Sequence, residues 1–196
     1  MEEKRISEQE SLELIARMIK ETQEHTNRKA AYPFLIWGYT TVLVTLAVWA
    51  VGLKFGFSKA SLLWLVLPIV GGLLMYVCRE REEEVRVKNH VERFVGHIWL
   101  VLGCLGGAYS LLSGWVSIPI LFIIVLLMSI GVTLTGLAIK LSSLTVCGAI
   151  GLCLSFVFHF MPNSVMQLPV FAFTFVVMMI VPGHIMHCKL KSSCKN

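Results

Sequence analysis

The chain contains no aspartate, and its glutamates occupy only two short stretches, residues 2 to 24 and 80 to 92. The rest of the sequence therefore has no carboxylate side chain. Membrane proteins that move protons or sodium ions commonly use a carboxylate inside the bilayer, so this absence argues against cation transport. It also excludes a Ser-His-acid triad within the apolar part and disfavours membrane enzymes that hold a metal with carboxylates.

Sequence motifs that identify an enzyme are also missing. There is no Walker loop, no GxGxxG segment opening a βαβ unit and no HExxH. Charge is scarce, since only 15% of the 196 residues are Asp, Glu, Lys or Arg, while 56% are hydrophobic. A soluble domain needs more charged surface than this. We therefore expect an integral membrane protein, and the missing motifs favour a non-enzymatic role without deciding it.

Apolar runs long enough to cross a bilayer occur six times. A spanning helix needs about 20 predominantly apolar residues. The sequence meets this requirement at residues 33–53, 60–78, 95–113, 117–139, 142–161 and 167–187. We predict an all-α membrane protein with six transmembrane helices.

Lysine and arginine set the expected orientation of these spans. They are frequent before the first span, between the second and third spans, and at the C-terminus, whereas only Lys54 and Lys59 fall on the opposite side. The positive-inside rule then places both termini in the cytoplasm, as in a multi-pass protein of the cell inner (plasma) membrane. The net charge of +5 fits contact with anionic lipid headgroups and gives no reason to expect nucleic acid as a partner.

The polar segments divide the chain further. Residues 1–32 are predicted to contain a cytoplasmic amphipathic helix, with Ser7 as N-cap and Glu10 completing a capping box. Its apolar face is formed by Leu12, Ile15, Met18, Ile19 and Thr22. This face can lie on the membrane, pack under the bundle, pair with a second copy as a homodimer, or bind a cytoplasmic protein. Residues 33–187 form the transmembrane domain, residues 79–94 a charged elbow within it, and residues 188–196 a cytoplasmic tail.

Histidines and a cysteine near the cytoplasmic ends of two spans are the strongest chemical candidates. His184 and His187 are i, i+3 neighbours, and Cys188 follows directly. If the third span packs beside the sixth, His97 joins them and completes an imidazole and thiolate set suited to zinc, copper or iron. Interfacial histidines also commonly bond to backbone carbonyls. We therefore expect no cofactor, with a bound metal or haem as the alternative.

Small residues and prolines predict how the helices pack and bend. Gly103 and Gly107 form a GxxxG step, and Gly151 lies on a small-residue face of the fifth span. Such faces pack helices closely, either within one bundle or between two copies. Pro68, Pro182 and Gly183 weaken the backbone ladder of the second and sixth spans, where we expect kinks.

Several of these segments together resemble a family of small, functionally uncharacterised six-helix membrane proteins found in Bacteroidota. The resemblance covers almost the full length. It is carried by the SEQESL opening at residues 7–12, LIWG at 35–38, the start of the third span at 96–99, GVTLTGLAIK at 131–140 and VPGHI at 181–185. The chain departs from the family after Lys140, where a proline is usual and Leu141 stands here. The resemblance implies an inner-membrane location and this architecture, without naming a reaction.

Three functions are compatible with the sequence. The favoured one is a non-enzymatic sensing, regulatory or scaffolding role exercised through the cytoplasmic helices. The second is a small transporter or channel for neutral, lipophilic or anionic solutes, formed by the kinked spans. The third is a metal- or haem-binding redox protein that uses His97, His184, His187 and Cys188.

Overall fold

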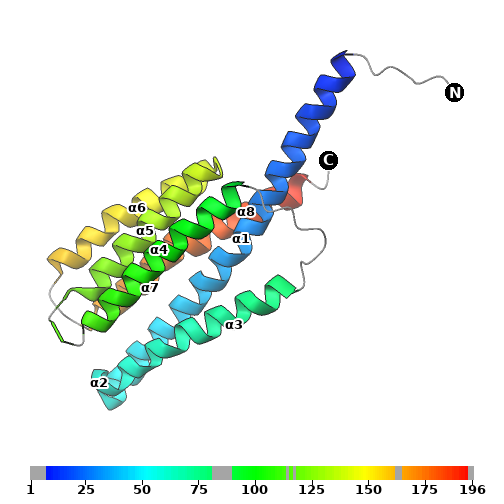
Figure 1. The fold of residues 1–196 in the computed structure, drawn as a ribbon. Coiled ribbons are helices and arrows are strands. Elements are labelled where there is room, and N and C mark those ends of the chain that lie inside the picture. The colour runs from blue at the N-terminus through cyan, green and yellow to red at the C-terminus, as the bar shows by residue number, and fades with distance from the viewer. Residues whose placement is uncertain (1–7, 81–89, 114, 117, 162–164, 194–196) are drawn as a thin grey trace.

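The computed structural model describes residues 8–80, 90–113, 115–116, 118–161 and 165–193, and every regular element in these ranges is a helix (Figure 1). The α-helices are α1 (Glu8–Phe55), α2 (Phe57–Ala60), α3 (Val66–Glu80), α4 (His90–Leu112), α5 (Ile120–Ala138), α6 (Ser142–Phe160), α7 (Gln167–Phe175) and α8 (Val181–Ser193). A 3-10 segment, Ser61–Leu65, precedes α3, and a π-helical turn, Val176–Ile180, joins α7 to α8.

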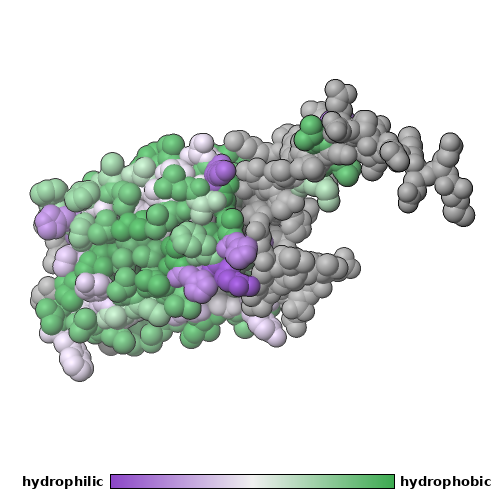
Figure 2. All heavy atoms as spheres, turned by 45° about the horizontal axis from the view of Figure 1, so that its top comes forward, coloured by the Kyte–Doolittle hydropathy of each residue, from purple (hydrophilic) through white to green (hydrophobic). Residues whose placement is uncertain are grey.

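Six stretches of these helices are long and apolar enough to cross a membrane. They run over Ala31–Phe55, Ser61–Cys78, His90–Leu112, Ile120–Ala138, Ser142–Phe160 and Gln167–Cys188. The predicted all-α class is therefore confirmed for the described residues, together with six helical stretches that are long and apolar enough to span a membrane. Figure 2 shows one face of the bundle, which is mostly hydrophobic, with hydrophilic residues towards its ends.

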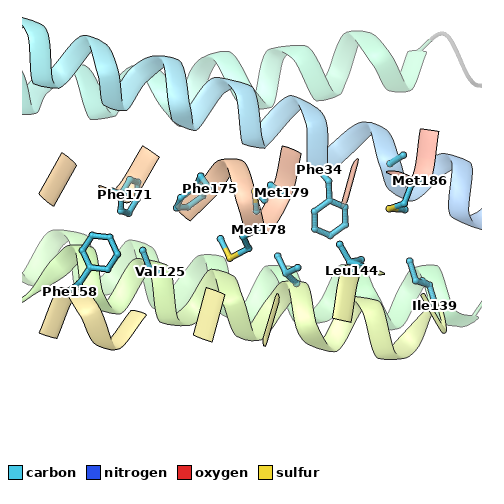
Figure 3. Packing of buried hydrophobic residues seen from close by; sticks show 12 residues of the cluster. Phe34, Val125, Ile139, Leu144, Phe158, Phe171, Phe175, Met178, Met179 and Met186 are labelled. Carbon is cyan, nitrogen blue, oxygen red and sulfur yellow. The ribbon is translucent and has the colours of Figure 1, made fainter. Parts of the chain in front are cut away.

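The bundle has α1 and the α7–α8 span on one side and the α5–α6 hairpin on the other. The first and last spans of the sequence are neighbours in space, because α1 packs along α7, the π-helical turn and α8. Helix α4 packs mainly on α5, and α3 packs on α1 (Figure 1). The core lies between the two sides (Figure 3). Its largest apolar members are Phe34, Ile139, Leu144, Phe158, Phe171, Phe175, Met178, Met179 and Met186.

Glycines that face hydroxyl side chains hold α5 and α6 close together. A Cβ atom at Gly136 would lie 2.5 Å from the Thr145 backbone nitrogen. One at Gly148 would lie 2.7 Å from the Thr133 nitrogen. Both distances are too short for a real Cβ contact, so only glycine permits this spacing. Lipid offers no hydrophobic force between helices, and close packing of this kind is what replaces it.

The turn between α5 and α6 is a Schellman motif. Lys140 has a positive φ of 55°. The Leu141 N–H donates to the Gly136 carbonyl at 2.8 Å, and the Lys140 N–H donates to the Leu137 carbonyl at 3.2 Å. These two bonds satisfy carbonyls that the helix end would otherwise leave unpaired. Lysine thus closes a turn in which glycine is the usual residue.

The predicted N-terminal helix and the first span form one element, since α1 is continuous over 48 residues and contains Pro33. Figure 1 shows its first part projecting beyond the bundle, near the C-terminal end of α8. The proposed N-cap Ser7, most of the charged elbow at 79–94 and residues 194–196 of the tail lie outside the described residues. Helix α3 ends at Glu80, α4 begins at His90, and α8 continues past the predicted span end to Ser193.

Candidate functional site

Two glycines bring α1 and α8 into close contact near the end at which α1 projects. A Cβ atom at Gly38 would lie 2.9 Å from Ile180 Cγ1, and one at Gly183 would lie 2.7 Å from Leu35 Cδ2. Each glycine therefore accepts a side chain from the opposite helix. Each is also followed directly by a polar residue, Tyr39 on α1 and His184 on α8.

These two polar side chains are joined across the contact. The Tyr39 hydroxyl and His184 Nε2 are 2.7 Å apart, a short hydrogen bond. The two rings meet edge to face, with centroids 6.0 Å apart and an interplanar angle of 81°. Two residues that are 145 positions apart in the chain thus form one polar pair between the first and last spans.

The π-helical turn before α8 sets the register of His184. In this turn the Val181 N–H donates to the Val176 carbonyl, five residues earlier. Pro182 follows, is almost completely buried and has no N–H to donate. A π-helical turn adds a residue to the helix and rotates everything after it, so the turn decides which face of α8 His184 occupies. Such turns are frequent at functional sites.

The pair faces outward from the bundle, inside the span. Tyr39 is 45% exposed, and His184 is also exposed. Tyr39 lies eight residues after Ala31, where the first span begins, and His184 lies four before Cys188, where the last span ends. At about 1.5 Å per residue, the pair is roughly 6 to 12 Å inside the span. Intramembrane ionisable residues are expensive to place, and their presence favours a functional role.

The hydrogen-bonding capacity of the pair exceeds its single mutual bond. If the tyrosine hydroxyl donates to Nε2, its oxygen can still accept; if Nε2 donates, the hydroxyl hydrogen is available to another group. The tautomer of His184 selects between these states. The pair is therefore suited to recognising a polar group that approaches laterally.

The predicted metal ligands do not converge among the described residues. His97 Nδ1 lies 2.7 Å from the Arg93 carbonyl of its own helix, and α4 packs on α5 rather than beside α8. His187 and Cys188 are exposed on α8. In the described ranges no group of three His, Cys or Glu side chains is arranged to hold a metal ion. His184 instead pairs with tyrosine.

The glycines predicted to pack helices fall into two groups. Gly151 is buried on α6, where a Cβ atom would lie 2.6 Å from Ser129 Oγ and 3.0 Å from Met178 Sδ. It therefore packs within the bundle. Gly103 and Gly107 have no atom of another residue near their Cβ positions, so their side of α4 is uncovered in the described structure.

The residues predicted to kink the spans have different surroundings. Pro68 is the third residue of α3, in the first turn, where helix N–H groups lack intrahelical partners in any case. The irregular 3-10 segment precedes it. Pro182 and Gly183 follow the π-helical turn directly. Pro182 and Gly183 thus lie where the helix changes from π-helical to α-helical, next to His184, the partner of Tyr39.

Tyr39 is the site residue that sequence reasoning did not identify. The available signal is the repeated pattern of a glycine followed by a polar ring, Gly38 with Tyr39 and Gly183 with His184. Neither dipeptide is informative alone, since their partnership depends on the packing of the first span against the last. No family model, curated protein or solved structure matches the chain.

Proposed function

We propose that this is a non-enzymatic, multi-pass protein of the cell inner membrane, with a sensing, regulatory or scaffolding role exercised through its cytoplasmic helices. The observation that carries the proposal is the continuity of α1 from Glu8 to Phe55. One helix bears both Tyr39, paired with His184 inside the span, and Leu12, exposed on the projecting part.

A continuous helix is a direct way to transmit a local change. If the contact between Tyr39 and His184 is made or lost, α1 can tilt or rotate against α8, and its projecting part must move with it. The seating of Ile180 against Gly38 and of Leu35 against Gly183 couples the two helices closely, so a change at the polar pair is passed to α1. The two arrangements of α1 against α8 would form the two-state element that regulation requires.

The projecting part supports a role in partner binding. Leu12 is 66% exposed, which is unfavourable for an apolar side chain in water. In the α-helical register, positions 15 and 19 share the face of Leu12, whereas Glu13 and Arg17 lie on the opposite face. We propose that this amphipathic segment is cytoplasmic and that its apolar face is covered by a second copy or by a cytoplasmic protein.

Continuity with the span disfavours one alternative for this face. A helix that runs straight out of a membrane span leads away from the bilayer, so residues 8 to 30 cannot lie flat on the surface while α1 is unbroken. The lysine and arginine distribution supports cytoplasmic termini. The SEQESL, LIWG and VPGHI segments support membership of the Bacteroidota six-helix family. The proposal includes the lipid bilayer as a partner of the spans and does not include nucleic acid.

Photo-crosslinking from two adjacent positions tests the role of the apolar face. A photoreactive amino acid is placed at position 12 or, as the matched control, at position 13, in the full-length protein in its native membrane. We expect a defined protein adduct from position 12 and none from position 13, because Leu12 lies on the apolar face and Glu13 on the charged face.

Mass spectrometry of the adduct distinguishes a homodimer from a foreign partner. An adduct of twice the chain's mass containing only its own peptides identifies a second copy. Absence of a position-12 adduct, with the protein inserted and stable, would remove the proposed role of the cytoplasmic segment.

A further inference from the structure

The pair formed by Tyr39 and His184 is open to the bilayer and closed towards the bundle. Its inner side is occupied by the glycine contacts, where Gly38 meets Ile180 and Gly183 meets Leu35. Its outer side carries exposed Tyr39 and His184 side chains. A molecule that reaches the pair must therefore approach laterally from the lipid. An amphiphile is suited to this route, because its apolar part stays in the lipid while its polar part contacts the pair.

The face of α1 next to the pair offers an apolar surface for a chain. Leu43 and Leu46, one and two turns deeper in the span than Tyr39, are 66% and 42% exposed. On the other helix Val181, one turn deeper than His184, is 39% exposed. An acyl chain lying along these residues would point towards the middle of the bilayer and leave its head at the polar pair.

The geometry of the pair selects the head group. Tyr39 and His184 can each donate one hydrogen bond when a ligand replaces their mutual bond. A carboxyl group has two acceptor oxygens on one carbon, so it can take both donors at once, whereas an alcohol has a single oxygen. The carboxylates of the chain lie within residues 2–24 and 80–92, so none lies near Tyr39 in the sequence of α1 and none occurs in α8.

The depth of the pair separates a fatty acid from a phospholipid. The pair lies four to eight residues inside the apolar stretches of α1 and α8, where burying a charged phosphate among apolar side chains would be costly. A single-chain acid can place its carboxyl at this depth without burying a phosphate.

We propose that Tyr39 and His184 form the head-group site for a single-chain fatty carboxylic acid that enters from the bilayer. The carboxyl oxygens accept hydrogen bonds from the Tyr39 hydroxyl and His184 Nε2, and the chain lies along Leu43, Leu46 and Val181. This proposal names the chemical class of the signal that the protein would sense. Binding itself does not depend on the proposed function, but the regulatory effect of binding rests on it.

Binding is measured with oleic acid carrying a ¹³C-labelled carboxyl group. The full-length protein is placed in phosphatidylcholine nanodiscs, and the carboxyl NMR signal is followed during titration. We expect a second signal, distinct from acid dissolved in the bilayer, that saturates at a fixed ratio to protein. His184→Ala and Tyr39→Phe should each weaken this binding by about tenfold or more, the loss of one strong hydrogen bond.

The matched control is His97→Ala, which removes the same side chain from an exposed position on α4. It should leave binding unchanged. Thermal unfolding of each variant shows that the fold is retained, and Tyr39→Phe keeps the ring in place if His184→Ala does not fold. Oleyl alcohol should compete at least tenfold less well than oleic acid.

Three results would overturn the assignment: no saturable signal in the unmodified protein, equal binding in the Tyr39→Phe and unmodified proteins, or equal competition by oleyl alcohol. These failures are separable from failure of the proposed function. Oleic acid binding without a position-12 crosslink removes the regulatory role alone, and a position-12 crosslink without oleic acid binding removes the ligand alone.

Discussion

The α5–α6 hairpin and α3 are similarly apolar spans with very different surroundings. A third of the residues in each hairpin span, 33%, are buried, against 6% in the span that contains α3. Hydropathy identifies both equally well as membrane helices. It does not say which of them will be enclosed, because in lipid an exposed apolar side chain carries no penalty.

The difference in burial between the α5–α6 hairpin and α3 is also found at single glycines. Gly148 on α6 meets the backbone of Thr133, whereas Gly72 on α3 has no atom near its Cβ position. Helix α4 resembles α3 in this respect at Gly103 and Gly107. A glycine in a membrane helix is therefore a packing device only where another helix uses the space that it leaves.

The largest expected effect comes from adding one methyl group to an enclosed glycine, and the control adds the same group to an uncovered glycine. Gly148→Ala forces the new Cβ against the Thr133 Oγ1 and backbone nitrogen, at 2.5 and 2.7 Å. We expect it to lower the free energy of unfolding by about 1–3 kcal/mol, as overpacking does. Unfolding by sodium dodecyl sulfate in mixed micelles, followed by circular dichroism, provides the measurement.

Gly103→Ala is the control on the uncovered face of α4. It should stabilise the protein by up to about 1 kcal/mol, since alanine favours helix over glycine and meets no neighbour. A loss at Gly103 as large as that at Gly148 would show that the α4 face is covered in the folded protein and that the two regions do not differ as described.

A smaller effect is expected at the turn that closes the hairpin. Lys140 adopts φ 55°, which disfavours a residue with a side chain by roughly 1 kcal/mol. Lys140→Gly should therefore raise the free energy of unfolding by about that amount. Lys54→Gly, within the last turn of α1, should lower it, because that position is helical. The same sign for both variants would contradict the Schellman turn.

The smallest effect concerns the attachment of the edge helix α4 to the hairpin. Trp99 Nε1 donates to Thr135 Oγ1 at 3.2 Å. Thr135→Val should cost about 0.6 kcal/mol of unfolding free energy, the average for a hydrogen bond between membrane helices. The Trp99 indole proton should also shift in NMR spectra.

Thr174→Val is the matched control for this substitution. Thr174 is equally buried but bonds to the Val170 carbonyl within its own helix span. Its replacement should leave the Trp99 resonance in place. An unmoved Trp99 signal in Thr135→Val would mean that other contacts, such as the edge-to-face packing of Trp99 on Phe34, fix α4.

The sequence singles out His184 as a candidate metal ligand with His97, His187 and Cys188, because of its i, i+3 spacing to His187. It gives no indication of Tyr39. The structure pairs His184 with Tyr39 instead. His187 and Cys188 lie one turn further along α8 on a similar face, whereas Tyr39 reaches His184 only because the first span packs against the last, whatever their separation in sequence.

The helical class and the six bilayer-long helices follow from the apolar runs of the chain alone, because such a run satisfies its backbone hydrogen bonds internally and needs no other part of the chain. Three features depend on how the helices pack: the first span lies against the last, Gly148 is enclosed while Gly103 is not, and Tyr39 meets His184. The physical reason is that lipid solvates every apolar face alike. Helix association then depends on close fits and hydrogen bonds between residues distant in sequence.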